Sequence, residues 1–219
     1  MSEYKYKTVA ARGEAEQVIE KSRFIAYAAP VSTREEADAF IASVRAAHRD
    51  ATHNVPAMVI GDKFQIQWGS DDGEPQGTSG APIVQMLVKE GITNVAIVVT
   101  RYFGGIKLGT GGLVRAYTSS AKLGIQSAGL CGVKDMAVLT ARVDYTYLSR
   151  LQNMAQKGEG GFSLRNITYE DKLTMELVCE PENLGNLRAL LSDITGGKAE
   201  ILTENIENAK IILDTGKGL

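Results

Sequence analysis

Hydrophobic residues in the first part of the chain follow strand-like and helix-like spacings in turn. Residues 24–31 form an apolar run that predicts a strand, and residues 33–36 then have the order of a helix capping box. The helix that follows has an apolar stripe at three- and four-residue spacing, made by Ala37, Phe40, Ile41 and Val44. The runs 55–60 and 64–68 predict paired strands around a turn at residues 61–63. This pattern indicates a helix packed on a sheet.

Glycine-rich segments separate the next predicted elements. Residues 69–80 are dense in Gly, Ser, Asp and Thr, and they lead into a helix predicted over residues 81–90. Residues 94–100 include a continuous apolar run, which is typical of a strand covered on both faces. A second glycine-rich loop, residues 101–112, precedes a helix predicted over residues 113–127. Each loop therefore ends where a helix is expected to begin.

The pattern restarts after a predicted linker at residues 129–135. The order expected beyond it is strand, helix, strand, strand, helix, strand, over residues 136–143, 147–157, 163–169, 173–179, 183–195 and 199–206. This order is typical of a ferredoxin-like βαββαβ sandwich, in which two helices cover one face of an antiparallel sheet. We therefore expect an α+β protein with domains at residues 1–131 and 136–208 and a tail at residues 209–219.

Composition and charge narrow the functional classes. The 219 residues are 44% hydrophobic and 23% charged, as in a folded protein that needs no metal or disulfide for stability. Lys and Arg total 24 against 26 for Asp and Glu, so only a local basic patch could bind nucleic acid. Cys131 and Cys179 lack the spacing of a disulfide framework or a zinc site. The polar start and the lack of an apolar run of ~18 residues predict a cytoplasmic protein without a membrane partner.

The segment from Arg101 to Arg115 has the features of an anion-binding loop. A buried strand ends there, five glycines free the backbone, and a helix begins with its positive end towards the loop. Arg101, Lys107 and Arg115 add three cations with no acidic residue between them. The spacing from Gly104 to Gly109 is that of a phosphate loop, but Thr110 stands where that motif has lysine. The alternative is that these glycines serve only tight turns and close helix–strand packing.

The other candidate groups are carboxylates and histidines. Asp71, Asp72 and Glu74 lie within four positions, and they could form a solvated turn with a helix cap, a Mg²⁺ site or a recognition loop. His48 and His53 span a predicted helix end, which favours capping or anchoring of a loop over a metal site. No nucleophile–base pair is recognisable in the sequence.

These segments together resemble the YigZ/IMPACT family. The resemblance is strong over about the first 130 residues and rests on Lys21-Ser22-Arg23-Phe24, His48 with Ala51 and His53, Ser70 to Pro75 with Gly77-Thr78 and Gly80, Arg101 to Gly105, and Leu108 to Leu113. Two positions depart from the family pattern, because Arg49 stands where proline is common and Ser79 where alanine is common.

The resemblance implies the folds of the two domains and a connection with translation. The first domain should be of the α/β type shared by a small-subunit ribosomal protein, domain four of the translocating elongation factor and the GHMP kinases. The second should be similar to domain five of that elongation factor. Eukaryotic relatives regulate translation by binding a protein, but they carry a different second module. For the bacterial branch the resemblance implies no reaction.

Three functions remain open from the sequence. The first is a non-enzymatic, translation-related regulator that binds RNA, the ribosome or a translation protein through Arg23, Arg101, Gly104, Gly105, Lys107, Gly109, Thr110, Gly111, Gly112 and Arg115. An accessory loop would contribute His53, Asp71, Asp72, Glu74 and Thr78. The second is a phosphate-ligand enzyme with Mg²⁺ on Asp71, Asp72 or Glu74, and the third is a pure protein-interaction module. No cofactor is expected, and the oligomeric state stays open.

Overall fold

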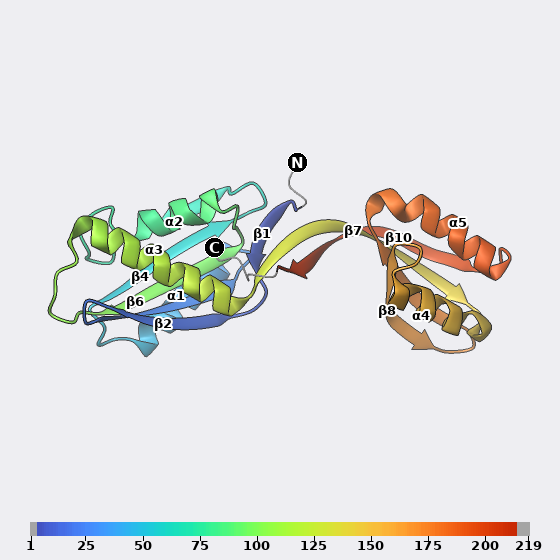
Figure 1. Cartoon of the computed structure of the whole chain (residues 1–219), viewed down its shortest axis with the longest axis horizontal. Coiled ribbons are helices and arrows are strands. Elements are labelled where there is room, and N and C mark those ends of the chain that lie inside the picture. The colour runs from blue at the N-terminus through green and yellow to red at the C-terminus, as the bar shows by residue number, and fades with distance from the viewer. Residues whose placement is uncertain (1–3, 214–219) are drawn as a thin grey trace. The chain divides into compact units, whose positions relative to one another are not determined.

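The computed structural model of the chain describes residues 4–213, which form two compact units (Figure 1). The first unit contains the described residues up to Val133 and those from Lys210 onwards, and the second runs from Lys134 to Ala209. Helices and strands are mixed in both units, which confirms the predicted α+β class. The last part of the predicted tail, residues 214–219, lies outside the described residues.

The first unit is built on an antiparallel sheet with the strand order β2-β3-β6-β4-β5. Its strands are β2 (Gly13–Ile19), β3 (Ser22–Pro30), β4 (His53–Ile60), β5 (Ile66–Gly69) and β6 (Val95–Tyr102). The continuous apolar run that predicted a doubly covered strand belongs to β6, which is the central strand. The prediction is therefore confirmed, because helices pack on both faces of this strand.

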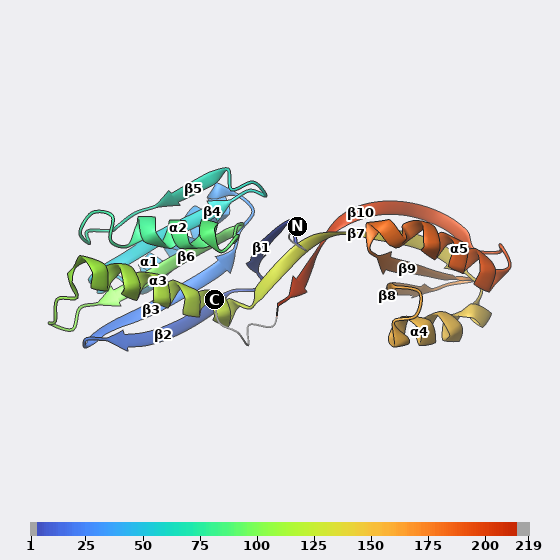
Figure 2. The same ribbon diagram turned by 45° about the horizontal axis from the view of Figure 1, so that its top comes forward.

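Helix α1 (Arg34–Ala47) covers one face of this sheet, and α2 (Gly80–Lys89) and α3 (Gly109–Ala128) cover the other. Figure 2 shows α2 and α3 side by side along the sheet. The predicted cap of α1 is confirmed, since the Glu36 amide donates to the Thr33 hydroxyl at 3.2 Å. In return, the Glu36 carboxylate accepts from the Ser32 amide at 2.7 Å.

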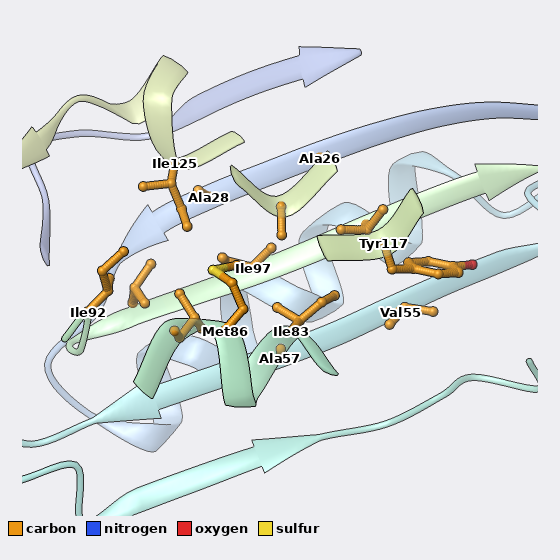
Figure 3. Packing of buried hydrophobic residues seen from close by; sticks show 14 of the residues in the cluster. Ala26, Ala28, Val55, Ala57, Ile83, Met86, Ile92, Ile97, Tyr117 and Ile125 are labelled. Atoms are coloured by element: carbon orange, nitrogen blue, oxygen red, sulfur yellow. The ribbon is translucent and has the colours of Figure 1, made fainter. Parts of the chain in front are cut away.

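The main hydrophobic core lies between the sheet and the pair α2–α3. Figure 3 shows alanine and β-branched side chains of the strands facing longer side chains of the helices. Tyr117 of α3 lies at one end of this cluster, beside Val55, and Ile92 lies at the other end. Tyr117 and Phe24 are both fully buried, and their rings meet edge to face with centroids 5.4 Å apart. The core therefore ends in aromatic side chains at the edge where β6 ends.

Three features of the first unit differ from the sequence-based expectation. Strands β1 (Tyr6–Val9) and β2 were not predicted, and in β2 exposed and half-buried residues alternate without an apolar run. Helix α3 begins at Gly109 instead of residue 113, so three of the five glycines lie in its first turn. The second glycine-rich loop is correspondingly shorter than the predicted 101–112, because β6 continues to Tyr102.

The second unit has the strand order β10-β7-β9-β8 in its sheet. Its elements are β7 (Leu130–Val143), α4 (Leu148–Lys157), β8 (Phe162–Tyr169), β9 (Leu173–Cys179), α5 (Leu184–Thr195) and β10 (Glu200–Ile212). Leu151 of α4 and Leu187 of α5 are buried in one cluster with alternate residues of β7 and β9. This succession and strand order is the ferredoxin-like arrangement.

At the ends of this unit, Lys134–Ala209, the chain forms strands where the sequence predicted a linker and a tail. Residues 130–135 of the expected linker instead form the start of β7, whose first residues pair with β1. The expected tail begins inside β10, which continues to Ile212, and the Leu213 amide donates to the Leu130 carbonyl at 2.8 Å. Thus residues 210–213 belong to the first unit.

The cysteines and the helices carry two further structural facts. Cys131 and Cys179 are buried and free of disulfide bonds, and burial raises the pKa of both thiols. Within residues 4–213, no helix has the length and apolar character that a membrane crossing requires.

Candidate functional site

Three neighbouring strands place side chains in one row at the end of the first sheet. Arg101 of β6 lies between Phe24 of β3 and His53 of β4 in the antiparallel register. Side chains directly opposite each other in paired strands point to the same face. Phe24 belongs to the core under α2 and α3, so Arg101 and His53 also point to that side. The row brings together residues that are far apart in the sequence.

Glu74 from the loop between β5 and α2 completes this cluster. Its side chain is 4% exposed, and its Oε1 accepts hydrogen bonds from Arg101 Nη1 at 2.6 Å and from the Tyr117 hydroxyl at 2.7 Å. Burial, followed by the hydrogen bond to Glu74, raises the pKa of Tyr117, which keeps its proton available for donation. The carboxylate thus joins the two glycine-rich segments predicted to act together.

Arg101 is held from several sides but keeps one unused donor. Its guanidinium lies 5.3 Å from the ring centroids of both Phe24 and Phe103, and its Nη2 donates to the Ser22 hydroxyl at 3.3 Å. Only 5% of the side chain is exposed. Its Nε is the one buried side-chain nitrogen or oxygen among residues 4–213 that has no hydrogen-bond partner. A buried donor without a partner is unusual in a folded protein.

His53 presents one ring nitrogen to the same cluster. Its Nδ1 lies 2.7 Å from the Asp72 carbonyl oxygen, which can only accept, so Nδ1 carries the proton. Its other ring nitrogen, Nε2, lies 3.7 Å from Glu74 Oε1, so it is an acceptor when the ring is neutral and pairs with the carboxylate when the ring is protonated. The imidazole thus lies next to a buried carboxylate–guanidinium pair.

Asp71 organises the loop that carries Glu74. Its carboxylate accepts from the amides of Gly77, Ser79 and Gly80 at 2.7, 3.1 and 3.0 Å, and from the Ser79 hydroxyl at 2.8 Å. Burial alone would raise the pKa of Asp71, but these hydrogen bonds outweigh it and hold the pKa below its usual 3.8. The carboxylate lies at the first amides of α2, so it also takes the role of a helix cap.

Replacing Asp71 with asparagine should lower the free energy of unfolding by about 1–3 kcal/mol at neutral pH, because charge-assisted hydrogen bonds are lost. Since folding lowers this pKa, the ionised carboxylate stabilises the fold above pH 3.8, and the contribution disappears as the pH falls through the folded-state value. The difference between wild type and variant should therefore shrink below pH 3.8. Urea unfolding, monitored by the fluorescence of the single tryptophan, Trp68 in β5, measures the stability difference at neutral pH and its decrease at low pH.

Asp38→Asn is the matched control for this prediction. Asp38 is half exposed and pairs with Arg34 on the surface of α1. The urea unfolding midpoint of this variant should therefore equal that of wild type. Equal stability of Asp71→Asn and wild type at neutral pH would contradict the capping role.

The three loop carboxylates do not converge on a metal site. Asp72 accepts from Arg45 Nη2 at 2.7 Å and from the Asn54 amide at 2.6 Å, away from the partners of Asp71 and Glu74. Within residues 4–213, no group of three or more metal-binding side chains is formed. Thr78 is buried, and its hydroxyl donates to the Pro75 carbonyl at 2.6 Å. The loop is thus fixed by its own hydrogen bonds.

A pocket of about 440 Å³ opens above the cluster. Its lining includes the start of α3 together with residues of β4, β6 and both loops: Thr52, His53, Glu74, Pro75, Arg101, Phe103, Lys107, Leu108, Gly109, Thr110 and Leu113. The N-cap residue of α3 is Leu108, whose side chain has no hydrogen-bond acceptor. The start of the helix, where Gly109 and Thr110 line the pocket, therefore has no cap from this side chain, and free amides at a helix start favour an anion.

The other predicted cations differ in their relation to this pocket. Lys107 lines it and also lines, with Arg115, an adjacent hollow on the β2 side of α3, and both side chains are exposed. Arg23 lies on the opposite face of the sheet, where it forms a bidentate pair with Glu16 at 2.8 and 2.9 Å. Arg101, Lys107 and the start of α3 are thus brought together, whereas Arg23 is not.

His48 is also separated from His53. Residue 48 caps the end of α1, and its ring lies between the hydroxyls of Tyr27 at 2.7 Å and Tyr102 at 2.8 Å. Burial raises the pKa of Tyr27 to about 12. Tyr27 packs with the α1 cluster, so this chain of side chains lies on the other face of the sheet. The placement fits capping and anchoring.

The glycines of the second loop have different structural roles. A Cβ on Gly104 would lie 2.0 Å from the Lys21 carbonyl oxygen, so this position requires close backbone approach. Gly105 and Gly109 have positive φ angles of 89° and 69°, which favour glycine. Gly111 and Gly112 lie in the first turn of α3.

Tyr117 is a site residue that the sequence did not reveal. It falls within the helix predicted over residues 113–127, and nothing in the sequence assigns it to a site. A buried tyrosine needs a partner for its hydroxyl, and that need was the available signal. Its partner, Glu74, lies 43 residues earlier, so local spacing could not identify it.

Comparison with known proteins finds similarity over both units. The Impact N-terminal domain matches residues 20–125, and a domain of unknown function, DUF1949, matches residues 142–198. The chain is 41% identical over 198 residues to the IMPACT family member YvyE of Bacillus subtilis (strain 168), covering 90% of each protein. It is 34% identical over 186 residues to the IMPACT family member YigZ of Escherichia coli (strain K12), covering 84% of this chain and 90% of that relative.

A solved structure is also similar along most of the chain. A crystal structure of a hypothetical protein shares 32% identity and a TM-score of 0.55, covering 90% of this chain and 96% of the other.

Proposed function

The chain belongs to the IMPACT family, and on that premise we propose that it is a non-enzymatic, translation-related factor that binds RNA through the start of α3. The first unit would receive backbone phosphates at the pocket and the hollow beside it. The first domain's resemblance to translation proteins supports this class of partner.

The observation that carries the proposal is a pair of unpaired cations beside an uncapped helix start. Lys107 and Arg115 are exposed, and neither has a carboxylate partner among residues 4–213. The positive end of α3 adds to their field. Phosphate binding at such a helix start is a general property of backbone amides.

Arg101 has a different part in this proposal from the one expected from sequence. Its charge is neutralised by Glu74 and it is almost fully buried, so surface phosphates would not reach it. We assign to Arg101 and Glu74 the floor of the pocket, and to Lys107 and Arg115 the contacts with the RNA backbone.

Binding of a short single-stranded RNA, measured by fluorescence anisotropy, tests the proposal. Affinity for the full chain should fall steeply between about 50 and 200 mM salt, because phosphate contacts release counterions. The double variant Lys107→Ala/Arg115→Ala should bind about ten-fold more weakly at low salt, with a salt slope smaller by about 1.4.

Lys89→Ala is the matched control, since Lys89 is exposed at the far end of α2 and should not affect binding. The proposal fails if the wild type does not bind at low salt, or if the double variant binds like the wild type.

Protein binding is a second candidate, favoured by exposed apolar side chains on the same loop. Phe103 and Ile106 are 47% and 37% exposed. Affinity capture with and without ribonuclease separates the two candidates. Partners lost after ribonuclease favour RNA, whereas partners that are retained by the wild type and lost by Ile106→Asp favour direct protein contact.

A further inference from the structure

We propose that the 440 Å³ pocket takes one nucleoside monophosphate, with the phosphate at the start of α3 and the base against Phe103. This inference rests on the proposed function and names the ligand class of the same site. The nucleoside monophosphate could be free or the 5′ end of an RNA, since the recognised chemistry is the same.

The size of the pocket limits the ligand to a single small unit. Its volume lies near the lower end of the roughly 300–1,000 Å³ typical of small-molecule sites. A folded RNA or a folded protein domain would contact only the rim of the pocket, whereas a single nucleotide can enter it. The pocket is therefore suited to a monomeric ligand or to a chain end.

The walls are apolar and include an aromatic ring. Pro75, Leu108 and Leu113 line the pocket together with Phe103, which keeps 47% of its surface exposed. The Arg101 guanidinium lies over the same ring at 5.3 Å and helps to hold it. An exposed ring backed in this way is a stacking surface for a base, which has a flat aromatic face of its own.

The polar groups are separated into an anion-binding end and a neutral floor. Lys107, the Gly109 and Thr110 amides and the Thr110 hydroxyl lie at the start of α3, where a phosphate is favoured. On the floor, the Arg101 and Glu74 charges cancel. A ligand that is anionic at one end and uncharged at the other fits this distribution.

The floor also offers a hydrogen-bonding group for an uncharged part of the ligand. In the neutral His53 ring Nε2 is an acceptor, because Nδ1 donates to the Asp72 carbonyl. A ribose hydroxyl or an amino group at a base edge can donate to it. Inorganic phosphate alone would leave the floor and the walls unused.

Isothermal titration of the full chain with adenosine monophosphate, adenosine and inorganic phosphate tests the inference. Adenosine monophosphate should bind at least about ten-fold more tightly than adenosine or inorganic phosphate, because it alone contacts both ends of the pocket. Phe103→Ala should weaken it about ten-fold or more, and Phe103→Trp should retain it, since stacking contributes roughly 1–3 kcal/mol per base. RNA with a 5′-phosphate, compared with 5′-hydroxyl RNA, shows whether the ligand is a chain end or a free mononucleotide.

The outcomes separate this inference from the proposed function. Equal affinity for inorganic phosphate and adenosine monophosphate, or tighter binding of a phosphoserine peptide, overturns the inference. Absence of nucleotide binding also overturns it, and the proposed function survives if RNA still binds in a manner that depends on Lys107 and Arg115. If mononucleotides bind but no RNA binds at low salt, the inference stands and the RNA proposal fails.

Discussion

Replacing Arg101 with methionine should reduce the free energy of unfolding of the first unit by about 3–5 kcal/mol, because it leaves a buried carboxylate without its counter-ion. The side chains of Arg101 and Glu74 are 5% and 4% exposed, and Arg101 Nη1 lies 2.6 Å from Glu74 Oε1. The cost arises from the unpaired charge, so Glu74→Gln/Arg101→Met should lose less than the sum of the single substitutions. Trp68 fluorescence during urea unfolding measures this loss in the first unit.

Arg23→Met is the matched control for this prediction. Arg23 lies on the adjacent strand and also pairs bidentately with a glutamate, but both partners are exposed. It should leave the unfolding midpoint unchanged. Similar losses for Arg23→Met and Arg101→Met would contradict the assignment of the buried pair as the centre of the site.

Gly104→Ala should destabilise the first unit by about 3 kcal/mol or prevent correct closure of the loop, because its methyl group would collide with backbone. The added Cβ would lie 2.0 Å from the Lys21 carbonyl oxygen and 2.5 Å from the Ser22 nitrogen, neither of which is a flexible side chain. The Gly104 amide also donates to the Ser22 hydroxyl at 3.2 Å, a contact that the collision would break. Thermal and urea unfolding measure the loss.

A second glycine of the same segment provides a control with the opposite sign. Gly111 lies in the first turn of α3, and its Cβ would meet only the Arg115 guanidinium at 3.7 Å. Gly111→Ala should therefore stabilise the fold by about 0.4–1 kcal/mol through a less flexible unfolded chain. If both substitutions have the same effect, the close approach of Gly104 to the β2–β3 turn is not a real constraint.

The elements with clear periodicity were predictable from sequence, and those with weak patterns were not. Strand β9 agrees with the predicted residues 173–179, since apolar residues alternate along it between two turns. Strand β2 lies at an edge and alternates glutamates with half-buried residues, so its sequence is similar to that of a polar loop. The early start of α3 was not predicted because glycines ordinarily indicate a loop. Each glycine destabilises a helix interior by about 1 kcal/mol relative to alanine.

The sequence indicated candidate residues on both glycine-rich segments but not how their charges pair. Residues of both segments line one pocket. However, the absence of acidic residues between positions 101 and 115 suggested an open cation at Arg101, and Glu74 reaches it from 27 residues earlier. Local sequence does not reveal such a partner, because the pairing depends on how the β5–α2 loop folds over the sheet end.

Backbone amide chemical shifts of the full chain, recorded by NMR during titration with 5′-phosphorylated RNA, test most directly whether phosphate binds at the start of α3. The account predicts that the Gly109 and Thr110 amides shift most and saturate together, and that the amides of α4 and α5 do not move. Shifts confined to the second unit, with Gly109 and Thr110 unchanged at saturation, would contradict it.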